Sequence, residues 1–185
     1  MPQPEHNSWL ASDQGNIIDL LNPDPGQISI QDIADGLSKV CRFNGQIKEF
    51  YSVAQHSMHV AELVPDQFKL QALLHDASEA YICDVPTPFK RMLGDAYSIV
   101  EQRLMVTIGQ ALDCDLSELH PTVKQADRIM VVSERDALQT VPMKWSPEYE
   151  DVPRYPNFCP KTNYTTGQIA RQFVDCYRRY KELPR

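Results

Sequence analysis

A histidine and an aspartate stand side by side in the segment LLHDASEAY, directly after an apolar run. They are His75 and Asp76, and a second acidic residue, Glu79, follows about one helical turn later. Polar and charged groups beside a buried run are costly unless something compensates them. A bound metal ion is one such compensator, so this segment predicts a metal site.

Two residues elsewhere in the chain can complete this site. His56 lies among small and apolar residues in AQHSMHVA, and Asp127 lies in KQADRIMVV, where helical phase turns it inward beside Met130. Imidazole and carboxylate groups together are a usual ligand set for a first-row divalent ion. A single helical histidine, or one His-Asp doublet, is more often a packed or surface feature. The combination of all four residues predicts a divalent metal site, with the ligands His56, His75, Asp76 and Asp127.

Further polar side chains could serve a reaction beside the ion. A divalent ion acidifies the water that it binds. Glu79 would face that water as a general acid or base if the helix continues from His75. Several cationic side chains could bind phosphate oxygens: Arg42, Lys90, Arg91 and Lys124. The plainer alternatives are a surface ion pair for Glu79 and a solvated helix start for Lys90 and Arg91.

The elements that must position these residues are mostly helices. Apolar residues at helical spacing, capping residues and prolines predict helices over residues 30–40, 53–64, 65–81, 95–112, 122–140 and 164–182. Ser29 is placed to cap the first of them. The sequence has no strand–helix–strand alternation, no GxGxxG and no Walker A motif, which argues against a Rossmann or P-loop fold.

The segments between the helices predict little β structure. The dipeptide Asn44-Gly45 favours a tight turn between two β-prone pieces, so a small β-hairpin is expected near residues 42–52. The segment NIIDLL, residues 16–21, could form a short strand. Residues 141–163 contain five prolines and predict a long irregular loop. The fold class expected from these elements is an all-α helical bundle.

Length and composition are those of an ordinary globular protein. The chain has 185 residues, of which 42% are hydrophobic and 23% are charged, and this suits a single domain over residues 1–185. We expect its core at about residues 28–140, with the C-terminal helix at about 164–182. The net charge of −7 argues against a nucleic-acid polymer as partner, but it leaves room for a small anionic ligand.

Cysteine use and the N-terminal sequence predict the compartment. The five cysteines are scattered without a CxxC pair, which fits reduced thiols better than disulfides or a zinc ribbon. The first residues have neither the basic nor the apolar region of a signal peptide, and no run approaches the length of a membrane span. We therefore expect a soluble cytoplasmic protein with no membrane partner.

The four candidate ligands resemble the H…HD…D pattern of the HD-domain metal-dependent phosphohydrolases, and the resemblance covers roughly residues 28–140. The strings CRFNGQIKEFYSVAQHS and LLHDASEAYICDVPTPFKR are similar to a compact branch of that superfamily. It contains the bacterial 5′-deoxynucleotidases and the phage dATP triphosphohydrolases. The resemblance implies an HD-domain helical bundle that holds a divalent ion, such as Co, Zn, Mn or Mg. It also implies a homo-oligomer, either a dimer or a hexamer.

The same resemblance implies roles for single residues. Glu79 matches the catalytic acidic residue that follows the doublet. The positions that contact base, sugar and phosphates in that family match Arg42, Phe43, Pro88, Lys90 and Lys124. The implied role of Phe43 is to stack on the base.

Three kinds of function are compatible with these residues. The first is a deoxynucleoside triphosphate triphosphohydrolase that converts dATP to deoxyadenosine and triphosphate, as in phage control of nucleotide pools; three nearby cations favour a polyphosphate. The second is a 5′-deoxynucleotidase that releases phosphate from a deoxynucleoside monophosphate. The third is a non-catalytic nucleotide-binding module. Hydrolysis of another phosphoester, such as a signalling nucleotide, is a further alternative.

Overall fold

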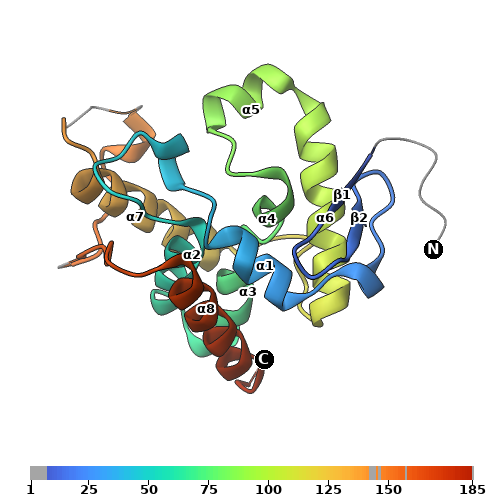
Figure 1. Cartoon of the computed structure of the whole chain (residues 1–185). Helices are drawn as coiled ribbons and strands as arrows, with labels where there is room; N and C mark the ends of the chain where they lie inside the picture. Colours follow the sequence, from blue (N-terminus) through green and yellow to red (C-terminus); the bar gives the residue numbers. More distant parts are fainter. Residues whose placement is uncertain (1–7, 142–144, 146, 157, 185) are drawn as a thin grey trace.

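The computed structural model of the chain describes residues 8–141, 145, 147–156 and 158–184. These residues form mostly helices, with one antiparallel hairpin of β1 (Trp9–Ala11) and β2 (Ile17–Asp19) (Figure 1). The α-helices are α1 (Ile30–Leu37), α2 (Val53–Glu62), α3 (Lys69–Leu74), α4 (Glu79–Ile82), α5 (Thr87–Leu93), α6 (Asp95–Leu112), α7 (Pro121–Leu138) and α8 (Thr166–Lys181). The 3-10 turns are η1 (Pro25–Gln27), η2 (Arg42–Gly45), η3 (Asp66–Phe68) and η4 (Pro147–Tyr149).

Helix α2 lies at the centre of the bundle and packs against α3, α7 and α8 (Figure 1). A capping box fixes its first turn: Ser52 accepts a hydrogen bond from the backbone of Gln55, whose side chain accepts one from the backbone of Ser52. One hydrophobic cluster surrounds α2 and extends from Ile18 in β2 to Tyr180 in α8. The central helix, which carries the fully buried His56, is therefore held at both its start and its flanks.

Most of the predicted elements are confirmed. Ser29 caps α1 by accepting a hydrogen bond from the backbone of Gln31. The helices expected at 53–64, 95–112, 122–140 and 164–182 correspond to α2, α6, α7 and α8. The segment NIIDLL contributes the strand β2. The described part of residues 141–163 contains only the 3-10 turn η4, as expected for an irregular loop.

The expected hairpin near residues 42–52 is wrong in position, because the chain has its small hairpin at β1 and β2 instead. Phe43, Asn44 and Gly45 all have positive φ angles, of 53°, 52° and 75°, so they form a left-handed turn. The backbone after this turn bonds elsewhere, because Lys48 donates to the carbonyl of Leu138. Of the predicted strand pairing, a single β-bridge is present, between Cys41 and Ser52.

The helix expected over residues 65–81 is also broken. Helix α3 ends at Leu74, and tight turns lead to α4 at Glu79. The Nδ1 atom of His75 lies 2.8 Å from the carbonyl oxygen of Ala72, the oxygen that a regular helix would pair with the amide of Asp76. The histidine side chain thus takes the place of a helical hydrogen bond.

Helix α5 differs from the other helices because none of its residues is buried. It lies at the top of Figure 1 beside α6. Cys83, which follows the end of α4, and Gly94, which follows α5, have positive φ angles of 64° and 61°. Segment 83–94 is therefore joined to the bundle at two sharp changes of backbone direction.

Two further expectations can be compared with the fold. All five cysteines are thiols rather than disulfides. Within the part of the chain that the structure describes, no helix combines the length and apolar character needed to cross a bilayer.

Two glycines provide a test of the packing. A Cβ atom on Gly109 in α6 would lie 2.5 Å from the backbone oxygen of Cys114, whereas one on Gly167 in α8 would meet nothing within 4 Å. We expect Gly109→Ala to lower the free energy of unfolding by about 1–3 kcal/mol, because the backbone must shift. Gly167→Ala should raise it by about 0.5 kcal/mol. Urea denaturation of both variants measures these changes, and equal stability of the two would contradict the close contact.

Candidate metal centre

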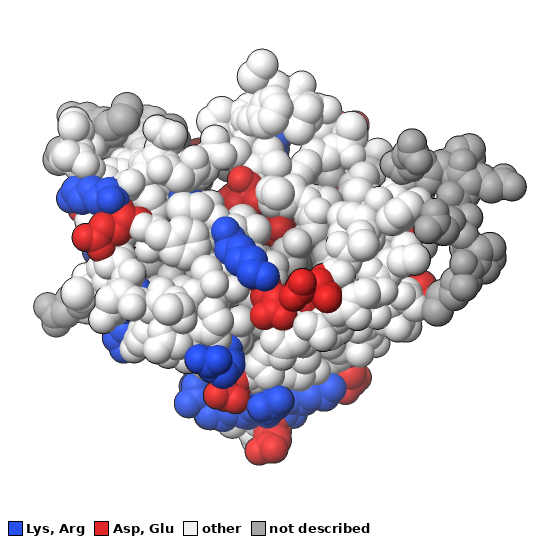
Figure 2. Space-filling view, in the orientation of Figure 1, with Lys and Arg blue, Asp and Glu red and all other residues white. Residues whose placement is uncertain are grey.

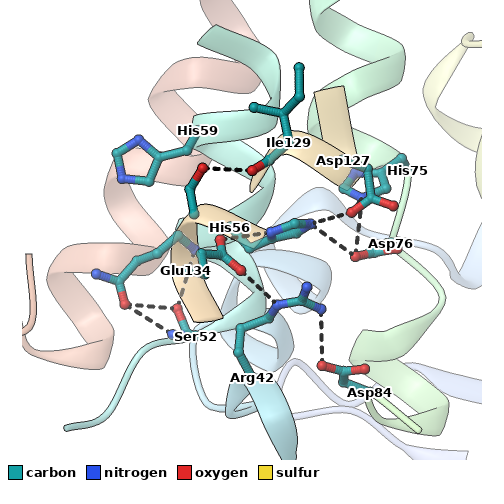
Figure 3. A network of polar contacts seen from close by, with 12 residues as sticks. Arg42, Ser52, His56, His59, His75, Asp76, Asp84, Asp127, Ile129 and Glu134 are labelled. Atoms are coloured by element: carbon teal, nitrogen blue, oxygen red, sulfur yellow. Dashed lines mark hydrogen bonds and ion pairs between the residues drawn. The ribbon is translucent and has the colours of Figure 1, made fainter. Parts of the chain in front are cut away.

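The four predicted ligands converge on one point between α2, α7 and the turn after α3 (Figure 3). The Nε2 atom of His56 lies 3.1 Å from Oδ1 of Asp127 and 3.7 Å from Oδ2 of Asp76. The Nε2 atom of His75 lies 3.2 Å from Oδ2 of Asp76 and 3.8 Å from Oδ1 of Asp127. Residues separated by as many as 71 positions therefore present their donor atoms to the same small volume.

The spacing of these atoms fits a metal ion. Donor atoms held at about 2.1 Å from one ion lie about 3 to 3.6 Å from one another, close to the separations found here. The ligand atoms of His56, His75 and Asp76 all lie within 4.8 Å of one another. Two carboxylates also offset the charge of a divalent cation.

The orientation of both imidazoles fits the same assignment. Their Nδ1 atoms are engaged, His56 with Oε1 of Glu134 at 2.8 Å and His75 with the carbonyl of Ala72 at 2.8 Å. Their Nε2 atoms are buried, and neither has a hydrogen-bond partner in the described chain. A buried ring nitrogen without a donor, facing two carboxylates, is the arrangement of a metal-binding histidine.

The charges of the centre shift the pKa values of its groups. Burial alone would lower the pKa of the His75 imidazole, but the carboxylates of Asp76 and Asp127 outweigh it and raise that pKa well above 6.5. Burial would raise the pKa of Asp76, but His75 and His56 lower it to about 2. The centre therefore attracts positive charge, either as protons on the imidazoles or as a metal ion.

Glu79 begins α4 beside the four ligands and is 4% exposed. Its Oε2 atom is buried and, among the described residues, has no hydrogen-bond partner. Burial, with the nearby carboxylates of Asp76 and Asp84, raises the pKa of Glu79 well above its usual value. A carboxyl group in this state holds its proton more readily than an ordinary glutamate does.

Lys90 is the predicted phosphate-binding residue that lies nearest to this acid. Its Nζ atom is 3.9 Å from Oε1 of Glu79 and 2.7 Å from Oε1 of Glu101. It also lies over the ring of Tyr97, 4.7 Å from the centroid. Lys90 thus brings a positive charge from α5 to the border of the centre.

Arg42 is buried behind the centre and is held by two carboxylates. Its Nη1 atom lies 3.0 Å from Asp84, and its Nε atom lies 3.4 Å from Glu134. Its guanidinium group is 5.6 Å from the ring centroid of Phe43. Phe43 in turn packs edge-on against Trp145, with the ring centroids 6.1 Å apart. This places an aromatic pair next to Arg42.

The other two expected substrate residues lie farther out. Pro88 is exposed in α5. Lys124 is exposed one turn before Asp127 in α7, and its Nζ atom lies 3.7 Å from Glu118. Figure 2 shows acidic side chains recessed in a hollow below α5, in the region that α4 occupies in Figure 1. Pro88 and Lys124 lie on α5 and α7, which flank the centre. In the described chain, no contact joins either residue to the centre.

Three residues of this region were missed from the sequence: Asp84, Glu134 and Trp145. Glu134 is the most buried of them, with no exposed surface. It follows Asp127 by seven residues in α7, which is about two helical turns, so both acids lie on one face. That heptad spacing is the signal in the sequence that could have identified it.

Comparisons with known proteins found relatives in two bacteria. No protein-family model matches it. The uncharacterized protein YfdR of Escherichia coli K12 is 42% identical over 135 residues, which are 73% of this chain and 74% of YfdR. An uncharacterized protein of Rhodobacter capsulatus is 40% identical over 110 residues, which are 55% of this chain and 56% of that protein. Neither name states an activity.

The pKa shifts predict that divalent metal affinity depends on pH. The ion competes with the proton on His75, and because the pKa of this imidazole is raised, that competition extends into the neutral range. Affinity for Co²⁺ should therefore increase between about pH 6 and about pH 8, with net release of protons. Calorimetric titration in two buffers of different ionisation enthalpy measures both quantities. Equal affinity at the two pH values, without proton release, would contradict the assignment of His75 as a ligand.

Proposed function

Because this chain belongs to the same protein family as YfdR of Escherichia coli, whose name states no activity, we propose its function from the chemistry of the centre. We propose a cytoplasmic, divalent-metal-dependent phosphohydrolase of the HD type that acts on deoxynucleotides. The observation that carries this proposal is the pair of buried Nε2 atoms of His56 and His75, which have no hydrogen-bond partner among the described residues and face two carboxylates beside the buried acid Glu79.

The residues that would hold the ion are His56, His75, Asp76 and Asp127. The ion would polarise a phosphoryl oxygen and lower the pKa of a neighbouring water molecule. The donor set is compatible with Co, Zn, Mn or Mg, and imidazole favours the transition metals among these.

The proton transfer is assigned to Glu79. Its Oε2 atom is buried and unpartnered in the described chain, and burial with the carboxylates of Asp76 and Asp84 raises its pKa, as suits a general acid or base. Glu79 would accept a proton from the attacking water or deliver one to the leaving oxygen. Lys90, whose ammonium group is 3.9 Å away, would offset the negative charge on the phosphate.

The positions of the cations favour a deoxynucleoside monophosphate as the substrate. Both Arg42 and Lys90 contact carboxylates, but Arg42 is buried, whereas Lys90 is half-buried and borders the centre, so Lys90 is the cation that a phosphate could reach. One cation suits one phosphate, and the products would be a deoxynucleoside and phosphate. Phe43, with Trp145 against it, would form the aromatic surface next to the base.

A triphosphate is the second candidate, and Lys124 supports it. This residue lies one turn before Asp127, and its contact with Glu118 joins two exposed side chains. Exposed ion pairs of this kind contribute about 0–1 kcal/mol. Lys124 could therefore leave Glu118 and bind the distal phosphates of dATP, with deoxyadenosine and triphosphate as products.

A homo-oligomer is part of the proposal. Large apolar side chains are exposed along α5 and the first turns of α6: Phe89, Met92, Leu93 and Ile99, with Met92 83% exposed. Contiguous exposed apolar side chains are typical of protein contact surfaces. A second copy of the chain is the partner that the family resemblance implies.

Product analysis by chromatography tests the proposed activity. The purified protein would be incubated with Co²⁺ or Mn²⁺ and either dAMP or dATP. Phosphate and deoxyadenosine from dAMP support the monophosphatase, and triphosphate from dATP supports the triphosphohydrolase. Glu79→Gln should lose roughly 10²- to 10⁴-fold in kcat, because the proton transfer is lost, while it still binds metal. Failure to hydrolyse either nucleotide would refute the enzyme assignment and favour a binding module. Full activity of Glu79→Gln would instead refute the role of Glu79 in proton transfer.

The role of Lys90 can be tested against its neighbour Arg91. Lys90→Ala should lower kcat/KM roughly 10- to 100-fold, because a charge-assisted contact with phosphate is lost. Arg91→Ala removes an equal charge from an exposed position of the same helix and should change kcat/KM by less than about twofold. Steady-state kinetics of both variants decide between a local and a general charge effect. An equal loss in both variants would contradict a specific role of Lys90.

A further inference from the structure

Side chains of helix α7 contact both nitrogen atoms of the His56 imidazole (Figure 3). Oδ1 of Asp127 is 3.1 Å from Nε2, and Oε1 of Glu134 is 2.8 Å from Nδ1. The first nitrogen faces the candidate metal centre and the second faces away from it. One helix thus supplies both a candidate ligand and the group that orients another ligand.

Glu134 has no exposed surface, and both of its oxygens are engaged. Oε1 contacts His56, and Oε2 accepts a hydrogen bond from Nε of Arg42 at 3.4 Å. A fully buried carboxylate is costly unless it is paired, and Arg42 provides that pairing. Arg42 is itself 8% exposed and is held from its other side by Asp84.

We propose that Glu134 is a positioning residue of the metal centre, which holds His56 with its Nδ1–H towards α7 and its Nε2 lone pair towards the ion. Arg42 acts on His56 indirectly, because it holds the carboxylate of Glu134 in place. The proposal rests on the metal centre of the proposed function. According to the inference, the affinity of the centre for the ion depends on Glu134, although Glu134 does not contact the ion.

The two histidines differ in a way that makes this testable. His75 is oriented by the backbone carbonyl of Ala72, which no substitution removes, whereas His56 depends on the side chain of Glu134. A glutamine at position 134 could direct its oxygen to His56 only by turning its NH₂ group towards the donors of Arg42. In the opposite orientation its NH₂ group would face Nδ1 and favour the tautomer with the proton on Nε2, which cannot bind a metal.

The experiment measures the Co²⁺ affinity of Glu134→Gln by competition with a chelating dye, together with the visible spectrum of bound Co²⁺. We expect affinity to fall roughly 10- to 100-fold and the spectrum to change. Glu62→Gln is the matched control, because Glu62 lies 3.1 Å from Nδ1 of His59, one turn after His56 in the same helix. Glu62→Gln should bind Co²⁺ as the unmodified protein does.

The melting temperature of metal-free Glu134→Gln shows whether this variant still folds. It therefore separates a role of Glu134 in positioning His56 from a role in folding. If Glu134→Gln does not fold, Glu134→Asp decides, because it keeps the charge but is too short to reach both His56 and Arg42; its Co²⁺ affinity should also be reduced. A folded Gln or Asp variant with unchanged Co²⁺ affinity would overturn the inference and leave the proposed function standing. Reduced affinity of the variant, with no nucleotide hydrolysis by the unmodified protein, would support the inference and refute the proposed function. If the unmodified protein bound no Co²⁺, both would fail.

Discussion

The contact between His56 and Glu134 is the interaction on which the rest of the structure depends. It joins the central helix α2 to α7 through two polar side chains with no exposed surface. Such a buried pair is stable only if its remaining polar atoms are satisfied. Arg42 meets this demand for Glu134, whereas Nε2 of His56 faces the carboxylates of the candidate metal centre and has no hydrogen-bond partner among the described residues. The hydrophobic cluster around α2 holds these groups in position.

The turn between α3 and α4 meets a second demand, which is to present several polar side chains from one short segment. An unbroken helix would distribute residues 75–79 around its axis at about 100° per residue. Here Nδ1 of His75 contacts the carbonyl oxygen of Ala72 and α3 ends. A new helix, α4, begins at Glu79. His75, Asp76 and Glu79 therefore reach one volume although they are nearly consecutive in sequence.

The sequence was sufficient for the parts of the site that depend on residue type and helical phase. The four candidate ligands lie close together, as helical phase and residue type indicate, and Glu79 lies beside them; their roles at a metal ion stay predictions. The reason given for Glu79 was wrong, since the helix from His75 does not continue. Glu134 was missed because its partner His56 lies 78 residues away: the spacing to Asp127 places Glu134 on the same face of α7, but the contact with His56 follows only from the packing of α2 on α7. The hairpin was misplaced because Asn44-Gly45 predicts a turn but not which backbone groups pair beyond it.

Segment 83–94 carries Lys90 to the border of the centre, yet α5 buries none of its residues. Substitutions in exposed segments outside a core usually change stability little, and the core of this chain lies elsewhere. Under the proposed function, the segment that would face the phosphate could therefore change in sequence with little effect on the core that carries the candidate ligands. Such separation would let the choice of substrate change in small steps without loss of the fold.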